Sequence, residues 1–394
     1  MSPSPPTGSA PTVYLHIGTL KSGTSFLQGV LWFHRELLAE DGVLYPGVER
    51  WSEQVDAVRD VLNEERRARS HIEVGAWESM CGRILAWPGR SAIMSMELLS
   101  LATPDRVERI VASLRPAEVH AVITARDLAR VIPSSWQETV QNRQTWSWEQ
   151  YVEGLTGSDQ DNSLPAHRFW RQQDVPRIAR SWADVIGADR LHLVVVPRTG
   201  APRDELWRRF APVVGLDPDA FVAPGHIRGN PAMGAASAEF VRRLNLRLGK
   251  GFDFKTYERS VKQYLSKNTL VHRADEERLR LPEQYETWAT ARATEIIGQL
   301  RELDIDVRGD LDELLPEPAA GGQPPLTLDE SEVAAAGVQA VEALVRSLAE
   351  PSADAEPVSG GGRQVGEDQQ QARRQARRRA RRAAGGSGQN PRRA

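Results

Sequence analysis

A lysine, a threonine and a serine lie together in a glycine-rich turn near the start of the chain. The turn spans residues 18–23, between an apolar, β-prone stretch at 13–17 and a segment with helical spacing of apolar residues. The free N–H groups and the dipole at the start of a helix favour an anion. Lys21 adds a cation, and Thr24 and Ser25 add hydroxyl groups. The sequence therefore predicts that this turn binds a phosphorylated donor molecule.

The turn differs from the phosphate-binding loop of ATPases and kinases. Its sequence is GTLKSGTS, and Thr24 stands where the Walker A pattern requires lysine, while Lys21 lies three residues earlier. Three of the four expected strands are followed by a cation, and none by the aspartate that would hold magnesium. Since ligands of an open parallel sheet bind at the carboxyl ends of its strands, we expect an anionic donor and no metal. A P-loop nucleotide or small-molecule kinase is the less favoured alternative.

The displaced lysine resembles the 5′-phosphosulfate loop of sulfotransferases that use 3′-phosphoadenosine 5′-phosphosulfate (PAPS). That loop reads Pro-Lys-Ser-Gly-Thr, then Thr or Ser, then Trp or Phe; here Leu20 replaces the proline. The matching residues are Lys21, Ser22, Gly23, Thr24, Ser25 and Phe26. A second family element is an arginine that ends a strand and a serine eight residues later, matched by Arg126 and Ser134. The resemblance spans roughly residues 12–305. The sequence of this region is similar to a bacterial, actinobacterial-type branch of the family.

The resemblance implies a role for each matched residue. Lys21 would contact the oxygen that bridges phosphate and sulfuryl group, where charge develops on the leaving adenosine 3′,5′-bisphosphate (PAP). The turn from Ser22 to Ser25 would bind the 5′-phosphate, and Phe26 would stack on the adenine. Arg126 and Ser134, which we expect at the start of the next helix, would hold the 3′-phosphate.

Two further elements of the family pattern are matched more loosely. The segment HIRGN at 226–230 stands where the family often has a late basic loop, so Arg228 and Gly229 are expected to close over the 3′-phosphate. Many members have a histidine or glutamate base after the second strand of the sheet. Glu97 occupies that position, and no histidine lies between His71 and His120. Glu97 is therefore the expected general base for the acceptor.

Each of these residues also has a plain structural interpretation. Lys21 could belong to a solvated loop, Phe26 could be an ordinary core residue, and Glu97 could cap a following helix. Arg126 and Ser134 could form a helix-capping pair, and the basic loop could lack a ligand.

The function that we expect is sulfuryl transfer from PAPS to a hydroxyl or amine of a small-molecule, glycan or lipid acceptor. PAP and a sulfated product would result. Besides the kinase, a non-catalytic PAP-binding protein remains an alternative.

The rest of the chain predicts an α/β protein. Apolar runs at 13–17, 91–96, 118–125 and 190–197 alternate with helical segments. This alternation predicts a P-loop-like parallel sheet of about four to five strands, with helices on both faces and a mostly helical C-terminal half. The 394 residues include one cysteine, Cys81, which excludes an internal disulfide.

Composition divides the chain into five segments. We expect a disordered leader at 1–11, a sulfotransferase-like domain at 12–315, a linker at 316–326, a helix at 327–350 that Thr327 and Glu330 could cap, and a disordered tail at 351–394. The tail has ten arginines and four acidic residues, so non-specific binding of a polyanion is expected there. No signal peptide or membrane-spanning run is evident, which favours a cytoplasmic protein.

Overall fold

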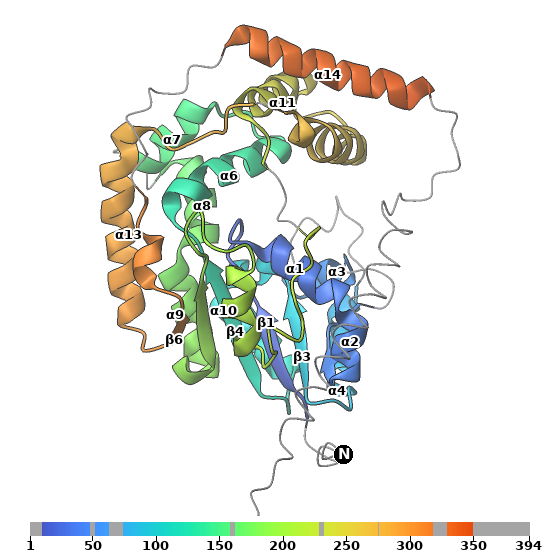
Figure 1. The fold of residues 1–394 in the computed structure, drawn as a ribbon, viewed down its shortest axis with the longest axis vertical. Coiled ribbons are helices and arrows are strands. Elements are labelled where there is room, and N and C mark those ends of the chain that lie inside the picture. The colour runs from blue at the N-terminus through green and yellow to red at the C-terminus, as the bar shows by residue number, and fades with distance from the viewer. Residues whose placement is uncertain are drawn as a thin grey trace, which may run out of the picture.

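The computed structural model describes residues 10–47, 52–62, 74–157, 162–227, 232–274, 276–317 and 329–349. Its centre is a six-stranded sheet with the order β2-β3-β1-β4-β5-β6 (Figure 1). All neighbouring pairs are parallel. The strands are β1 (Thr12–His16), β2 (Val43–Leu44), β3 (Ser91–Ser95), β4 (Val119–Ala125), β5 (Leu191–Val195) and β6 (Asp306–Arg308).

The predicted fold class is confirmed, with a sheet slightly larger than expected. The four predicted strands correspond to β1, β3, β4 and β5. The sheet gains two edge strands, β2 with two residues and β6 with three. Strands this short show no periodicity in a sequence. Only their pairing with β3 and β5 defines them.

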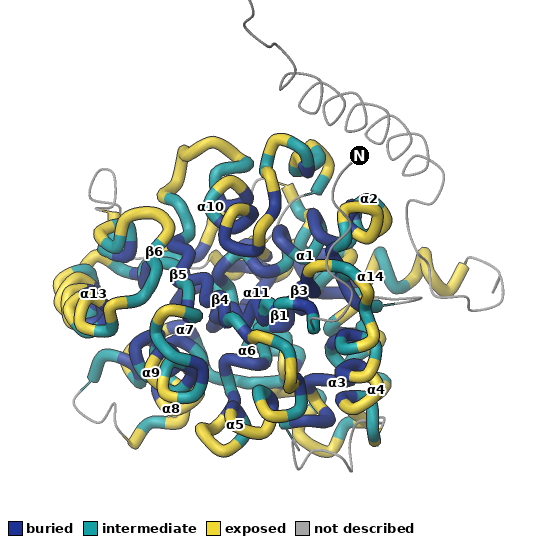
Figure 2. Tube along the Cα trace, turned by 90° about the horizontal axis from the view of Figure 1, so that it is seen from below, coloured by how far each residue is buried: buried dark blue, intermediate teal, exposed yellow. Residues whose placement is uncertain are grey.

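Helices cover both faces of the sheet, as the end-on view shows (Figure 2). On one face, Ile93, Val122 and Val194 pack against α1 (Thr24–Phe33), α2 (Arg35–Glu40) and α10 (Glu205–Val213). On the other face, Val13 and Leu15 belong to a larger apolar cluster. The helices that contribute to this cluster include α3 (Ser52–Val61), α4 (Ala76–Leu85), α5 (Pro104–Ser113), α9 (Val175–Ile186) and α13 (Glu286–Arg301). Alternate residues of each strand thus enter different cores.

A helical layer lies beyond the carboxyl ends of the strands (Figure 1). It contains α6 (Leu128–Gln141), α7 (Trp148–Thr156), α8 (Leu164–Gln173), α11 (Ala235–Leu248), α12 (Phe254–Tyr257), the π-helix η4 (Glu258–Lys267) and α14 (Glu330–Ala349). Short 3₁₀-helices complete the described structure: η2 (Glu97–Leu101), η3 (Ala188–Arg190), η5 (Leu270–His272), η6 (Glu283–Tyr285) and η7 (Leu311–Leu314). This layer places side chains above the sheet edge at which ligands of parallel sheets bind.

The last helix, α14, is attached to the rest of the molecule by charged pairs as well as by apolar packing. Arg243 of α11 contacts Glu330 at 2.6 Å, and Arg273 contacts Glu332 at 2.8 Å. Val333, Ala336 and Ala340 are buried on its inner face. Thr327, most of the expected leader and linker, and the whole tail at 351–394 lie outside the described residues. No helix among the described residues is long and apolar enough to cross a bilayer.

Candidate functional site

The glycine turn connects β1 to α1 at the carboxyl edge of the sheet. Gly18, Lys21 and Gly23 have positive φ angles of 67°, 67° and 87°, so the backbone curls tightly before the helix begins at Thr24. The turn is attached to the neighbouring strand β4, because the N–H of Thr19 donates to the carbonyl of Thr124 at 2.7 Å. The Ser22 hydroxyl also meets that of Thr124, at 2.6 Å. Buried partners therefore fix the turn in place.

Glycine is required at position 18 because another part of the site lies against it. A Cβ atom built on Gly18 would come within 2.7 Å of the Cβ of Glu97, the first residue of η2 after β3. Glu97 accepts a hydrogen bond from Gln28 of α1 at 3.0 Å. The structure therefore places the expected base beside the turn, at the position after β3 where the sequence predicted it.

Lys21 has a partner that the sequence analysis missed. Its Nζ atom lies 2.8 Å from Oε2 of Glu138 on α6, and each side chain is 30% exposed. Burial alone would raise the pKa of Glu138, but the charge and hydrogen bond of Lys21, together with the charges of Lys262 and Lys267, outweigh it and lower the pKa to about 2. Glu138 lies four residues after Ser134, hence on the same face of α6. That spacing was the only available signal in the sequence.

Arg126 follows β4 and reaches over the same turn. Its Nη1 atom donates to the carbonyl of Lys21 at 3.5 Å, the long end of the hydrogen-bond range. Burial, followed by repulsion from Arg130, lowers the pKa of Arg126 to about 10, so the side chain is still a cation at neutral pH. Its buried Nε–H finds no acceptor among the described residues. Buried donors are rarely left unpaired, so a ligand acceptor at this position would account for it.

Ser134 is not at the start of a helix, and that part of the prediction was wrong. The helix expected from about residue 134 is α6, which begins at Leu128 because the carboxylate of Asp127 caps it by accepting from the N–H of Arg130. Pro133 lies inside this helix rather than ending it. The hydroxyl of Ser134 donates to the Arg130 carbonyl at 2.9 Å. Its contact with a 3′-phosphate stays a prediction.

The remaining motif residues have different environments. Ser22 is buried, and its hydroxyl bonds within the turn and to β4. Thr24 is buried at the first position of α1, while Ser25 is half-buried. Phe26 is only 7% exposed and belongs to the apolar cluster beneath α1 and α10. The structure thus gives Phe26 a core environment, and its stacking on adenine stays a prediction.

The expected basic loop can be followed only to its start. Arg228 and Gly229 lie outside the described residues. The segment before them approaches α1, where Ile227 lies close to Gly29 and the ring of His226 lies 5.6 Å from that of Phe33. The described part of the loop therefore lies beside the helix that follows the glycine turn.

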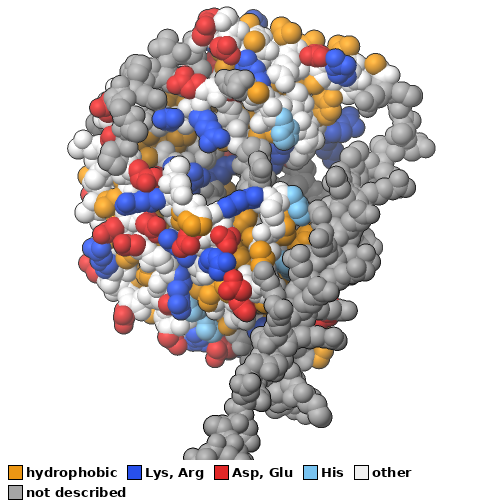
Figure 3. Space-filling model, in the orientation of Figure 1, with side chains coloured by type: hydrophobic (Ala, Val, Ile, Leu, Met, Phe, Trp, Pro, Cys, Tyr) orange, Lys and Arg blue, Asp and Glu red, His pale blue; other side chains and the backbone are white. Residues whose placement is uncertain are grey.

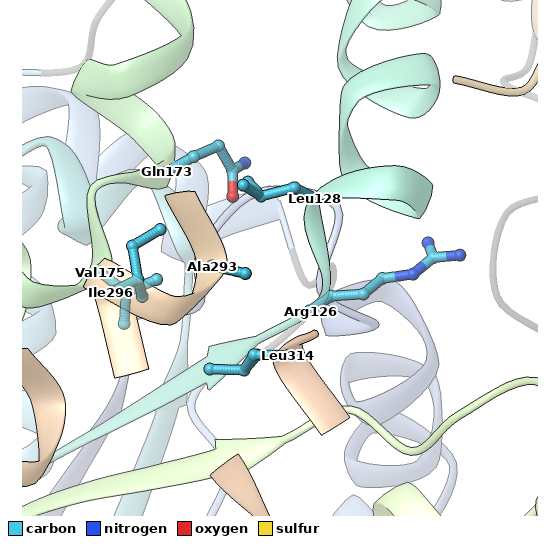
Figure 4. A pocket seen from close by; sticks show the side chains of 7 residues that line it. All are labelled: Arg126, Leu128, Gln173, Val175, Ala293, Ile296 and Leu314. Carbon is cyan, nitrogen blue, oxygen red and sulfur yellow. The ribbon is translucent and has the colours of Figure 1, made fainter. Parts of the chain in front are cut away.

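Two other features near the strand ends lie apart from this arrangement. Arg198, after β5, is exposed and donates to the Asp312 carbonyl at 2.8 Å. A small pocket with mainly apolar walls is lined by Arg126, Leu128, Gln173, Val175, Ala293, Ile296 and Leu314. The guanidinium of Arg126 points away from these side chains (Figure 4). The pocket therefore lies on the opposite side of Arg126 from its charged end.

The site combines two cations, Lys21 and Arg126, with two carboxylates, Glu97 and Glu138. Lys and Arg side chains also occur across the middle of the face shown in Figure 3, among acidic ones. Within the described ranges, no three His, Cys, Asp or Glu side chains form a group that could hold a metal ion. Chemically, the site offers backbone N–H groups, Lys21 and Arg126 to an anion, and Glu97 to a proton.

No family model and no curated protein matches the chain. Among solved structures, it is similar to the crystal structure of a sulfotransferase from Alicyclobacillus acidocaldarius, with 14% sequence identity and a TM-score of 0.36. The match covers 64% of this chain and 100% of that chain. A likeness of this size assigns no function.

Proposed function

We propose that the protein is a sulfotransferase that moves a sulfuryl group from PAPS to a hydroxyl or amine of an acceptor. The observation that carries the proposal is the meeting of Lys21 and Arg126 at one glycine turn, with an Arg126 N–H that has no acceptor among the described residues. A donor with two separate phosphates fits this arrangement. The turn and Lys21 would bind the 5′-phosphosulfate, and Arg126 the 3′-phosphate.

The proposed reaction is a single in-line displacement. The acceptor oxygen or nitrogen bonds to sulfur while the bond from sulfur to the phosphate oxygen breaks. The electron pair stays on PAP, where Lys21 stabilises the developing charge. Glu97 takes the proton from the acceptor. Its place beside the turn and its hydrogen bond from Gln28 support this role.

The kinase alternative differs in the donor. It requires a lysine at position 24 of the loop, where this chain has Thr24, and it predicts that binding depends on magnesium. Calorimetry with PAP and with ATP plus magnesium separates the two. We expect PAP to bind without magnesium and at least tenfold more tightly than ATP. Tighter binding of magnesium-ATP would favour the kinase.

Two experiments distinguish an enzyme from a non-catalytic PAP-binding protein: a search for a sulfated product and the Glu97→Gln variant. A screen of acceptors with labelled PAPS, read by mass spectrometry, should find a sulfated product. In the Glu97→Gln variant, we expect turnover to fall by about 10²- to 10⁴-fold, the usual contribution of a general base. PAP affinity should stay within about twofold of wild type, because Glu97 is assigned to the acceptor. Unchanged turnover would remove Glu97 from the mechanism.

A further inference from the structure

Glu138 lies in the site but has no part in the reaction described above. Its Oε2 atom pairs with Lys21 at 2.8 Å, and its Oε1 atom accepts from Asn142 at 3.1 Å. In the proposed reaction, Lys21 must bind the oxygen that leaves with PAP. A lysine ammonium that serves this oxygen would have to leave Glu138 or share its charge with it.

Two more lysines act on the same carboxylate from the helical layer. The π-helix η4 packs against α6. In a π-helix, residues five apart are neighbours, as the 2.8 Å bond from the Ser266 hydroxyl to the Val261 carbonyl illustrates. Lys262 and Lys267 have this spacing, and both act electrostatically on Glu138. Glu138 is therefore paired directly with Lys21 and lies within the electrostatic reach of two lysines on the helix that packs against α6.

The two lysines of η4 have unequal partners. Lys262 already has a carboxylate, Glu258, at 3.3 Å. Lys267 is half-buried and forms no ion pair or hydrogen bond with the described residues. Burial and the charges of Lys262 and Lys21 lower its pKa, while Glu138 opposes this change. Of the three lysines, Lys267 is thus the one without an ion-pair partner among the described residues.

We propose that Glu138 is a positioning residue that exchanges Lys21 for Lys267 when the donor binds. Without donor, Glu138 holds Lys21. With donor, Lys21 moves to the bridging oxygen, and Lys267 takes its place on Glu138, so that no carboxylate is left partly buried without a cation. The exchange rests on the proposed function, and it predicts that Glu138 competes with the donor for Lys21.

The test is PAP calorimetry on full-length variants. Glu138→Gln should bind PAP about three- to tenfold more tightly than wild type, because the competing ion pair is gone. Lys267→Gln should bind PAP more weakly by a similar factor, because the other lysine of η4, Lys262, is already paired with Glu258. In the Glu138→Gln, Lys267→Gln double variant, the loss caused by Lys267→Gln should disappear.

A control variant separates this exchange from a general effect of charge. Arg259→Gln removes an exposed cation of the same helix. Its PAP affinity should stay within about twofold of that of wild type. Weaker or unchanged PAP binding by Glu138→Gln would overturn the exchange, as would additive effects in the double variant. Absence of PAP binding by wild type would instead overturn the proposed function.

Discussion

Lys21 and Arg126 meet at one turn but differ in how their charges are balanced. Lys21 is neutralised by Glu138, and its backbone holds a positive φ angle that residues other than glycine adopt at some cost. Arg126 is half-buried, next to another cation, and has one donor without an acceptor among the described residues. Unfavourable features of this kind are typical of sites that complete their interactions with a ligand.

A third residue close to the turn, His16, makes the stability of the protein depend on pH. His16 is fully buried on β1 between the hydroxyls of Ser95 and Thr124, and burial lowers its pKa to about 3. The unfolded chain takes up a proton on this residue below its ordinary pKa, whereas the folded chain stays neutral. This contribution to stability is therefore lost as the pH falls through the window between the two pKa values.

We expect wild type to lose about 2 kcal/mol of unfolding free energy through His16 between pH 7 and pH 5. Urea titrations of wild type and His16→Gln at both pH values give the measurement. The variant should be less stable at pH 7 but should lose about 2 kcal/mol less on acidification. Equal losses in the two proteins would show that His16 does not remain neutral in the fold.

Sequence reasoning at this scale worked for residues that directly follow the strands of the sheet. The turn residues and Glu97 were predicted beside one another because each follows a strand of a parallel sheet, and Arg126 lies over the turn for the same reason. Glu138 was missed because its relation to Lys21 depends on how α6 crosses the sheet edge. No local pattern encodes that crossing.

Among the elements, the turn between β1 and α1 depends on an unusual backbone conformation. Gly18 combines a positive φ angle with a close approach to Glu97. Gly75 has a positive φ angle of 85° at the start of α4, and no other group lies within 4 Å of the position that a Cβ atom would take there. Substitutions at the two glycines therefore distinguish the strain of a positive φ angle, present at both, from the steric clash with Glu97, present only at Gly18.

Gly18→Ala should destabilise the fold by about 1–3 kcal/mol and weaken PAP binding at least fivefold, because the new methyl group must displace Glu97 or the turn. Gly75→Ala should incur only the backbone cost, about 1–2 kcal/mol, and leave PAP binding unchanged. Thermal unfolding and calorimetry measure both effects. Equal PAP affinity in the two variants would mean that the turn does not need this close packing.

Element boundaries were harder to predict than element types. The four central strands were recognised from their apolar runs, whereas β2 and β6 are too short to leave a pattern. The start of α6 was misplaced because Asp127 caps the helix well before Pro133, a residue that more often ends a helix than continues one. Pairing with neighbouring strands and packing of helices, rather than local propensity, determine where β2, β6 and α6 begin and end.

At the scale of the whole molecule, the proposed donor site lies between the sheet and the helical layer, while the arginine-rich segment at 351–394 is a separate feature of the sequence. The chain's net charge of −3 combines this basic segment with an acidic remainder. The clustered arginines suit electrostatic binding of a polyanion, without a specific site.

Deletion of residues 351–394 should abolish binding to a DNA duplex used as a polyanion probe, and should leave PAP affinity unchanged. Binding by the full chain should weaken steeply as salt increases, since it depends on counterion release. Fluorescence anisotropy at several salt concentrations measures this. Duplex binding that survives the deletion would assign it to another surface.

The donor assignment is tested most directly by PAP calorimetry on four proteins: wild type, Lys21→Ala, Arg126→Ala and the double variant. Wild type should bind PAP without magnesium. Each single variant should bind PAP at least about tenfold more weakly than wild type, as expected for a lost hydrogen bond to a charged group. The double variant should bind PAP more weakly still. Arg198→Ala is the matched control, because this exposed arginine follows the next strand and contacts Asp312 instead, so its affinity should not change. No binding by wild type, or equal binding by the double variant, would contradict the account.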